Sequence, residues 1–238
     1  MSEDVPNGGQ DDSRKRARPG GHPGGHPGGG TDPFPPGHSE RFERAYAGGR
    51  PPWDIGHAQA AIVKAFEDGW ISGRILDVGC GTGENSLFLA SRGLTVLGMD
   101  ASPTAIEAAR AKAEQRAAAA VFFVADIVGD VPAMYSEETF DTVVDIGFFH
   151  ALDDEQRAVW IERLAGLLAV GGSYVMLCFS DRVPGVWGPR RVSEEELIKT
   201  FTPATGFTDL QVVGSRLEAT VGANGVDAWL VRAERGVA

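Results

Sequence analysis

The sequence predicts a doubly wound α/β domain, in which helices cover both faces of a mostly parallel sheet. Short apolar runs typical of buried strands alternate with longer amphipathic runs typical of helices, and this alternation is characteristic of parallel sheets. The final two apolar runs have no helix between them, so we expect an antiparallel pair at one edge. Seven strands are expected, over residues 74–78, 95–99, 121–125, 140–146, 173–179, 207–213 and 228–233.

Helices are expected between these strands, over residues 84–92, 103–116, 154–170 and 193–201. Ser102 has a side chain suited to cap the second of these helices. Ser193 and Glu196 have the spacing of a capping box at the start of the last one. Gly171 and Gly172 are expected to end the helix over 154–170.

The composition divides the chain near residue 38. Residues 1–38 are rich in glycine and proline, and they hold too few apolar side chains to offset the entropy lost on ordering the backbone. We expect a disordered tail over 1–38 and a folded domain over 39–238. The tail contains His22, His26 and His38, but a flexible segment holds no preformed ligand cage, so no metal is expected.

The chain is strongly acidic, with 22 Lys and Arg against 33 Asp and Glu and a formal net charge of −11. Nucleic acids and anionic membranes are bound through Lys and Arg, so neither is expected as a partner. We find no apolar run typical of a transmembrane helix or a secretory signal. Cys80 and Cys178 lie in apolar stretches, which favours buried thiols and a cytoplasmic location.

A glycine-rich loop is the most informative segment. The apolar strand over 74–78 runs into Gly79, Gly81 and Gly83, and a helix is expected directly afterwards. In open α/β sheets such a loop lets a ligand approach the backbone beyond the carboxyl end of the strand. Asp100 follows Gly79 by 21 positions, a spacing suited to a carboxylate that accepts the ribose hydroxyls of an adenosine ligand.

Two acidic residues distinguish between adenosine ligands. Glu84 occupies the third small position of the dinucleotide fingerprint, where a negative side chain is unfavourable beside a pyrophosphate. Asp77, inside the strand, suits a cationic group such as the ammonium of an amino acid. The loop therefore favours S-adenosylmethionine over NAD. A dinucleotide-dependent dehydrogenase and a non-catalytic cofactor-binding module remain as alternatives.

Three segments resemble one family. The run Asp77–Gly83 (DVGCGTG) with its following acidic residue resembles the cofactor loop of class I S-adenosylmethionine-dependent methyltransferases, a resemblance that extends over about residues 40–235. Residues 51–56 (PPWDIG) resemble an N-terminal element of the small-molecule branch with thiopurine, thiol and halide methyltransferases. Residues 180–197 are similar to bacterial benzoquinone or hydroxyquinolone methyltransferases. The resemblance implies a Rossmann-like fold with a seven-stranded sheet.

The resemblance also implies roles for individual residues in binding S-adenosylmethionine. It assigns Asp77, Gly79, Gly81 and Gly83 to the methionine part, Asp100 to the ribose, Asp126 and Ile127 to the adenine, Asp145 to the region of the methyl group, and Trp53 to a position over the cofactor. For Asp126 the alternative is a turn cap. For Asp145, which lies inside a strand, the alternative is a structural acceptor for loop amides.

The acceptor side is less specific. His150 follows a strand on the expected ligand side and is a candidate general base, with shaping of the pocket wall as the alternative. Phe149 and Trp187 are expected to line an apolar acceptor pocket, with Trp187 on a loop interpreted as a lid. Core packing is the alternative for Phe149. Arg190 is expected to orient an anionic oxygen, or else to pair with the acidic residues at 194–196.

Together these features predict a methyltransferase that acts on a heteroatom of a small aromatic or heterocyclic molecule. Oxygen is favoured by the similarity of residues 180–197. Thiol or thiopurine S-methylation and a non-catalytic S-adenosylmethionine-binding protein are the alternatives. The sulfonium carries its own activation, so the reaction requires no metal. The oligomeric state is left open.

Overall fold

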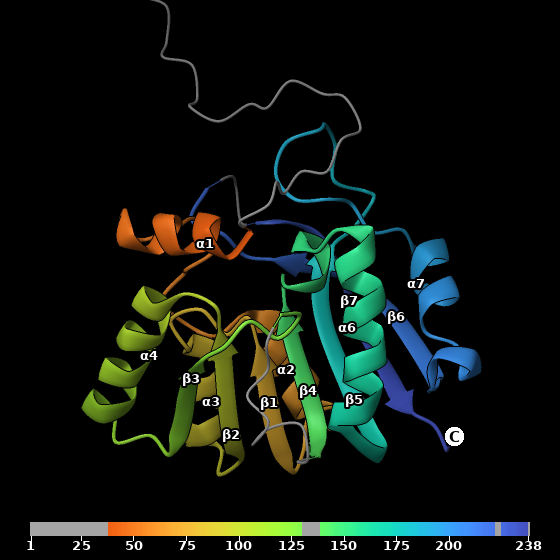
Figure 1. Cartoon of the computed structure of the whole chain (residues 1–238), viewed down its shortest axis with the longest axis horizontal. Coiled ribbons are helices and arrows are strands. Elements are labelled where there is room, and N and C mark those ends of the chain that lie inside the picture. The colour runs from red at the N-terminus through yellow and green to blue at the C-terminus, as the bar shows by residue number, and fades with distance from the viewer. Residues whose placement is uncertain (1–37, 130–138, 222–224, 238) are drawn as a thin grey trace, which may run out of the picture.

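A seven-stranded sheet organises the fold, in the order β3-β2-β1-β4-β5-β7-β6 (Figure 1). The computed structural model describes residues 38–129, 139–221 and 225–237. Strand β7 runs antiparallel to both of its neighbours, and the other neighbouring pairs are parallel. The strands are β1 Arg74–Val78, β2 Thr95–Asp100, β3 Ala120–Val124, β4 Phe140–Ile146, β5 Leu168–Phe179, β6 Phe207–Leu217 and β7 Val226–Arg235. The predicted fold class is confirmed.

Helices cover both faces of this sheet. They are α1 His38–Ala47, α2 Ala60–Glu67, α3 Glu84–Ser91, α4 Pro103–Gln115, α6 Asp154–Leu167 and α7 Glu194–Thr200, with short 3-10 turns η1 Phe149–Ala151 and η2 Pro203–Thr205. Successive side chains of β1 point to opposite faces of the sheet and so contact different helix layers. Ile75 packs with α2 and α3, whereas Leu76 packs with α6 and α7. The sequence predicted α3, α4, α6 and α7 but not α1. None of the helices within the described ranges has the length and apolar character needed to cross a membrane.

The tail predicted over 1–38 lies outside the described residues, apart from the backbone of His38, which begins α1. Its expected disorder therefore stays a prediction.

The predicted end of the helix over 154–170 was wrong. Helix α6 ends at Leu167, and β5 begins at Leu168, whose backbone is already extended. The pairing of β4 with β5 shifts register here, because Phe140 pairs with Leu168 while Thr142 pairs with Ser173. The glycine pair at 171–172 lies inside this irregular stretch, and a Cβ on Gly172 would meet the carbonyl oxygen of Ala169 at 2.8 Å. The pair therefore makes a close turn within the strand rather than a helix end.

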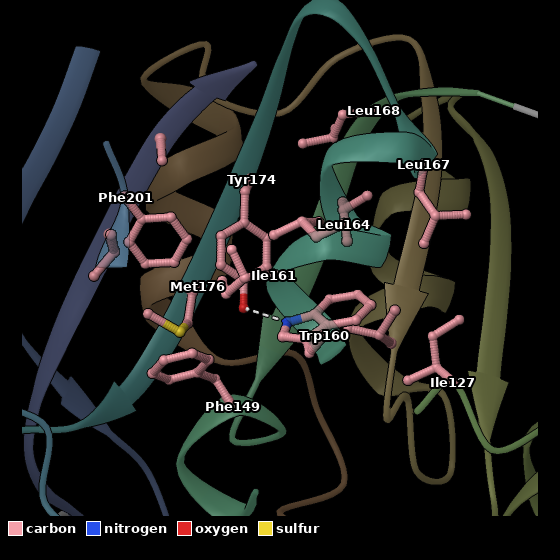
Figure 2. Packing of buried hydrophobic residues seen from close by; sticks show 14 of the residues in the cluster. Ile127, Phe149, Trp160, Ile161, Leu164, Leu167, Leu168, Tyr174, Met176 and Phe201 are labelled. Atoms are coloured by element: carbon pink, nitrogen blue, oxygen red, sulfur yellow. Dashed lines mark hydrogen bonds between the residues drawn. The ribbon is translucent and has the colours of Figure 1, made fainter. Parts of the chain in front are cut away.

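A buried polar cluster lies in the core beneath the carboxyl end of β4. The hydroxyl of Tyr174 donates to Oδ2 of Asp145 at 2.6 Å. The indole Nε1 of Trp160 donates to the same hydroxyl at 3.4 Å, as the dashed line in Figure 2 shows. Oδ1 of Asp145 accepts the backbone N–H of Phe148 at 2.8 Å, and Oδ2 accepts that of Phe149 at 3.1 Å. These bonds fix the start of η1, which carries part of the site described below.

The variant Tyr174→Phe tests the strength of this cluster. Burial raises the pKa of Asp145 to about 6, so its carboxyl is ionised at pH 7 and the lost bond is charge-assisted. We expect the free energy of unfolding to fall by about 1.5–3 kcal/mol at pH 7. At pH 5 the carboxyl is protonated and the expected loss shrinks toward about 1 kcal/mol. Urea unfolding at both pH values measures the change, and an equal loss at the two would contradict this account.

Candidate active site

A cavity of about 380 Å³ lies at the carboxyl ends of the parallel strands. Its walls come from the glycine loop after β1, the ends of β2, β3 and β4, the turn through η1, residues 187–189, and the ends of β6 and β7. Helix α1 contributes a further wall and lies above the sheet beside the start of α4 (Figure 1). Ligands of open α/β sheets bind at this edge.

The loop glycines line the cavity and are packed closely on both sides. Gly81 has a φ of +54°, and a Cβ there would lie 2.5 Å from the hydroxyl oxygen of Tyr46 in α1. Gly83 has a φ of +83°, and a Cβ there would lie 2.8 Å from the ring of Phe122 in the core. Neither the backbone conformation nor the space admits a side chain at these two positions. The loop therefore requires glycine at Gly81 and Gly83, and with Gly79 these residues form part of the cavity wall.

Asp100 ties the end of β2 to this loop. Its Oδ2 accepts the N–H of Gly81 at 2.9 Å, and its Oδ1 accepts the N–H of Ser102 at 2.8 Å. Burial raises the pKa of this carboxyl. Asp100 also lines the cavity, so the predicted spacing from Gly79 brings it to the ligand side.

Asp77 is fully buried beneath the loop and is not part of the cavity wall. Its Oδ2 accepts a hydrogen bond from the Ser86 hydroxyl at 2.5 Å, whereas Oδ1 has no partner among the described residues. Burial raises the pKa of Asp77 to about 7, and the negative charges of Asp145 and Asp100 raise it further. When this carboxyl near the end of β1 is ionised, its charge is therefore incompletely compensated.

The segment after β3 brings Asp126 and Ile127 to the cavity. Oδ1 of Asp126 accepts the backbone N–H groups of Val128 at 3.1 Å and Gly129 at 3.2 Å, which is the turn-cap arrangement considered as the alternative. Ile127 is nearly buried and packs into the core with one face while it lines the cavity.

Two residues expected at the site lie in the core instead. Phe149 is 1% exposed, packs against Phe201, and has the Arg157 guanidinium 4.4 Å above its ring. Figure 2 shows its side chain among the core residues. The 3-10 turn η1 starts at Phe149, and the residues on either side of Phe149 face the cavity. Phe148 therefore lines the cavity in place of Phe149. Asp145 also lies outside the wall, and its contacts favour the structural alternative.

His150 lines the cavity from η1 and is 6% exposed. Its Nδ1 accepts the backbone N–H of Phe179 at 3.0 Å, and the two rings meet edge to face with centroids 4.9 Å apart. Burial lowers the pKa of His150 to about 3, and the positive charges of Arg157 and Arg191 contribute to the shift. The imidazole is therefore neutral at physiological pH.

The predicted lid loop reaches the cavity through Trp187, whose ring lies 6.2 Å from that of Phe179. Arg191 holds the loop together, because Nη1 donates to the carbonyl oxygens of Trp187 and Pro189 at 2.6 Å each. Arg190 does not face the cavity: it pairs with Asp154 of α6 and with Glu196 of α7. The expectation that Arg190 orients a substrate is therefore corrected, because these carboxylates take up its guanidinium.

The N-terminal element adds residues that the sequence analysis missed. Trp53 lines the cavity, as expected, and its Nε1 donates to the Tyr46 hydroxyl at 2.9 Å. Phe42 and Tyr46 of α1 line the cavity on one helix face. Glu43, between them, accepts hydrogen bonds from the hydroxyls of Ser102 and Thr104 at 2.5 Å each. The aromatic pair at positions i and i+4 was the available signal for this helix.

The described residues contain no group of three or more His, Cys, Asp or Glu side chains arranged to hold a metal ion. Cys80 and Cys178 are both buried and unbridged, as predicted.

Comparisons with known proteins agree with this geometry. Residues 75–172 match a family profile described as a methyltransferase domain. A 2-heptyl-1-hydroxyquinolin-4(1H)-one methyltransferase from Mycobacteroides abscessus is 38% identical over 168 residues, which cover 66% of this chain and 73% of that protein. A probable thiol methyltransferase 2 from Arabidopsis thaliana is 32% identical over 178 residues, which cover 74% of this chain and 77% of that protein.

A solved structure from work on the conversion of a disulfide bond into a thioacetal group during echinomycin biosynthesis is similar along most of its length. It is 34% identical, has a TM-score of 0.71, and the match covers 83% of this chain and 91% of that chain. The glycine loop, the cavity at the strand ends and these relatives lead to one conclusion. The chain belongs to the class I S-adenosylmethionine-dependent methyltransferases, as a small-molecule methyltransferase that takes its methyl group from S-adenosylmethionine.

Proposed function

We propose that this enzyme methylates a heteroatom, with oxygen favoured, on a small aromatic or heterocyclic acceptor. The observation that carries the proposal is the acceptor side of the cavity, which is aromatic and apolar. Phe148, Phe179 and Trp187 line it together with aliphatic residues from the ends of β6 and β7, and His150 is a polar group among them. A flat apolar molecule with one polar heteroatom matches such a wall. The name of the hydroxyquinolone methyltransferase relative supports oxygen.

The cofactor half fits S-adenosylmethionine. The negative charge of Asp77 beneath the loop, with Oδ1 unpartnered, favours the cationic ammonium of the methionine part, and the glycines let the ligand approach the loop backbone. Asp100 would accept the ribose hydroxyls, Asp126 would accept the adenine amine, and Ile127 would pack on the adenine ring. Trp53 would cover the cofactor from the N-terminal element. When bound, S-adenosylmethionine supplies an electrophilic methyl group on a positively charged sulfur.

The protein's own contribution is to hold two reactants together and exclude water. Trp53 and Tyr46 line the cavity from the side of α1, and Trp187 lines it from the loop between β5 and α7. Asp145 acts as a positioning residue, because its hydrogen bonds hold the turn that bears Phe148 and His150. Nothing in this arrangement requires a covalent enzyme intermediate.

Methylation of a thiol is the second candidate. The probable thiol methyltransferase relative favours it, and a thiolate has the same charge as an ionised hydroxyl. The cavity described here accepts either atom, so the acceptor has to be identified by turnover.

Turnover on a small acceptor panel tests the proposal. The panel contains a quinol, a hydroxyquinolone, an aromatic thiol, a thiopurine and iodide, each with S-adenosylmethionine and with products identified by mass. We expect methylation of the hydroxyquinolone or the quinol at oxygen. Methylation of thiols alone would favour the second candidate. No turnover on any member, with S-adenosylhomocysteine still bound tightly, would contradict a small aromatic acceptor.

Asp100→Ala and Trp187→Ala separate the two halves of the cavity. We expect Asp100→Ala to weaken S-adenosylhomocysteine binding by about 100-fold or more, because it removes a charged acceptor and frees the loop N–H of Gly81. We expect Trp187→Ala to leave that affinity within about threefold and to lower kcat/KM for the acceptor by about tenfold. Calorimetry and steady-state kinetics measure both. Normal cofactor affinity in Asp100→Ala would refute the assignment of the loop.

Asp77→Asn tests the buried carboxylate. A carboxyl whose pKa is about 7 in the fold, against an ordinary 3.8, destabilises the folded state increasingly from about pH 4 to 7 and by a constant amount above that. The uncharged variant lacks this cost. We expect its free energy of unfolding to exceed that of the wild type by an amount that grows over this range, up to about 4 kcal/mol at pH 8.

The same variant is expected to bind S-adenosylmethionine about 10- to 100-fold more weakly, because the ammonium loses an anionic partner. Denaturation as a function of pH and calorimetry provide the two measurements. A variant that is less stable than the wild type at pH 8 would show that the carboxylate is compensated in the fold.

A further inference from the structure

The hydrogen bond between His150 and Phe179 determines which ring nitrogen of His150 carries a proton. A backbone N–H is only a donor, so Nδ1 of His150, 3.0 Å from the nitrogen of Phe179, must be the unprotonated acceptor. In a neutral imidazole the proton is then on Nε2. His150 therefore presents an N–H group, and not a lone pair, at its other nitrogen.

The surroundings of His150 keep the ring neutral. The charged groups that face it are Arg157 of α6 and Arg191 of the 180–193 segment, and both disfavour an imidazolium. No described carboxylate hydrogen-bonds to the ring, which packs edge to face against the apolar ring of Phe179. Protonation would have to occur at Nδ1 and would break the bond from Phe179. Uptake of a proton by His150 is thus unfavourable, because Nε2 already carries a hydrogen and Nδ1 accepts the N–H of Phe179.

The Nε2 nitrogen is open to the cavity. It lies on the side of Gly147, which also lines the cavity and where a Cβ would be 3.2 Å from it. Nε2 has no hydrogen-bond partner in the described part of the chain. Among the described residues, the side-chain atoms that are fully buried and lack a partner are Asp77 Oδ1 and Arg157 Nη2. Nε2 of His150 lacks a partner but is not one of these buried atoms, so it is accessible to solvent. An unpaired donor therefore faces the space that the acceptor would occupy.

We propose that His150 is a fixed hydrogen-bond donor that binds the methyl acceptor in its deprotonated form, and that it is not a general base. The substrate class is then an acidic aromatic or heterocyclic hydroxyl or thiol that reaches the site as an anion. This inference rests on the proposed function and narrows its acceptor. It also replaces the earlier expectation that His150 removes a proton.

The chemistry balances without proton transfer by the enzyme. The acceptor has lost its proton to water before it binds. A lone pair of its anionic oxygen or sulfur forms the new bond to the methyl carbon, while the bond from that carbon to the sulfonium sulfur breaks and leaves its electron pair on sulfur. An anion and a cation become two neutral products. The N–H of His150 offsets the loss of hydration of the anion between Phe148, Phe179 and Trp187.

His57 is the competing candidate for a base. It lines the cavity on its exposed rim, and its Nδ1 lies 2.9 Å from the carbonyl oxygen of Ala58, which accepts from it. Its Nε2 is therefore the nitrogen that has a lone pair, the opposite tautomer to His150. The two histidines make distinct predictions for the pH dependence of catalysis.

The tautomer is tested directly by 15N NMR on protein labelled at its 5 histidines, with His150 assigned by its absence in the Gln variant. The shifts of the two ring nitrogens report which one carries hydrogen. We expect Nε2–H and no titration between pH 5 and 9. A ring that titrates near pH 6.5, or that carries its hydrogen on Nδ1, would overturn the proposal. This readout needs no acceptor, so it is independent of the proposed function.

Three substitutions separate donor from base. In His150→Gln the amide N–H reaches the position of Nε2 but cannot act as a base. In His150→Asn the amide oxygen can still accept from Phe179, yet the side chain is too short to reach the acceptor, so this variant controls for the structural role. His150→Phe lacks both functions. We expect kcat/KM to stay within about tenfold of wild type in the Gln variant and to fall about 100-fold in the other two. A Gln variant as impaired as the Phe variant would argue for a base.

The pH profile gives a second, independent test on acceptors of graded acidity. For an acceptor that binds as an anion, kcat/KM rises to a plateau above the pKa of that acceptor, and the midpoint moves with the acceptor. A general base acting on a neutral acceptor gives a profile that falls above the acceptor pKa. The proposal would be overturned if kcat/KM fell above the acceptor pKa and if its rise at lower pH were lost in His57→Gln. That result would assign the base to His57. Absence of turnover with every acceptor would instead count against the proposed function.

Discussion

The acceptor side of this enzyme depends on the buried carboxylate of Asp145. It lies at the end of β4 without exposure to solvent, and it accepts hydrogen bonds from the Tyr174 hydroxyl and from the backbone N–H groups of Phe148 and Phe149. A buried charge requires such partners. Here the partners begin the turn that carries His150, so satisfying the charge also orients the turn. The same bonds send Phe148 and His150 to the cavity and Phe149 to the core.

The carboxyl groups around the cofactor half favour a cationic ligand. Asp77, Asp100 and Asp145 lie at or next to the carboxyl ends of three adjacent strands, and burial raises the pKa of each. Their negative charges also act on one another, since those of Asp145 and Asp100 raise the pKa of Asp77. A ligand with a sulfonium and an ammonium relieves this repulsion, whereas a pyrophosphate would add to it. Glu84, which argued against NAD in the sequence, is ion-paired with Lys112 at 2.8 Å, so its own charge is compensated.

The sequence predicted those features that depend on local pattern. Each of the seven strands was placed correctly, although β5, β6 and β7 proved longer than expected. Asp100 reached the cavity because the loop and the next parallel strand end at the same edge. The features that the sequence missed depend on which way a side chain points in the folded protein. In a turn of three residues, no periodicity distinguishes Phe148 from Phe149, and the hydrogen bonds to Asp145 decide which ring faces inward.

The same limit applies to Arg190 and to α1. Arg190 and Arg191 are adjacent in the sequence. Arg190 forms ion pairs with α6 and α7, whereas Arg191 donates to carbonyl oxygens of the lid loop. Helix α1 is positioned by hydrogen bonds from Ser102 and Thr104 to Glu43, contacts made about 60 residues apart in the sequence. No local signal encodes such partners.

The two halves of the cavity are thus built on different principles. The cofactor half uses the ends of β1 and β2 and the tightly packed loop between β1 and α3, where any side chain at Gly81 or Gly83 would collide with its surroundings. The acceptor half uses η1, the lid loop and the ends of β6 and β7. Loops on a rigid scaffold tolerate sequence change. Because His150 offers a donor within an apolar wall, acceptor choice on this scaffold depends on the acidity and shape of the acceptor. A different acceptor then requires changes in the residues that line the acceptor half, while the acceptor still loses its proton to water before it binds.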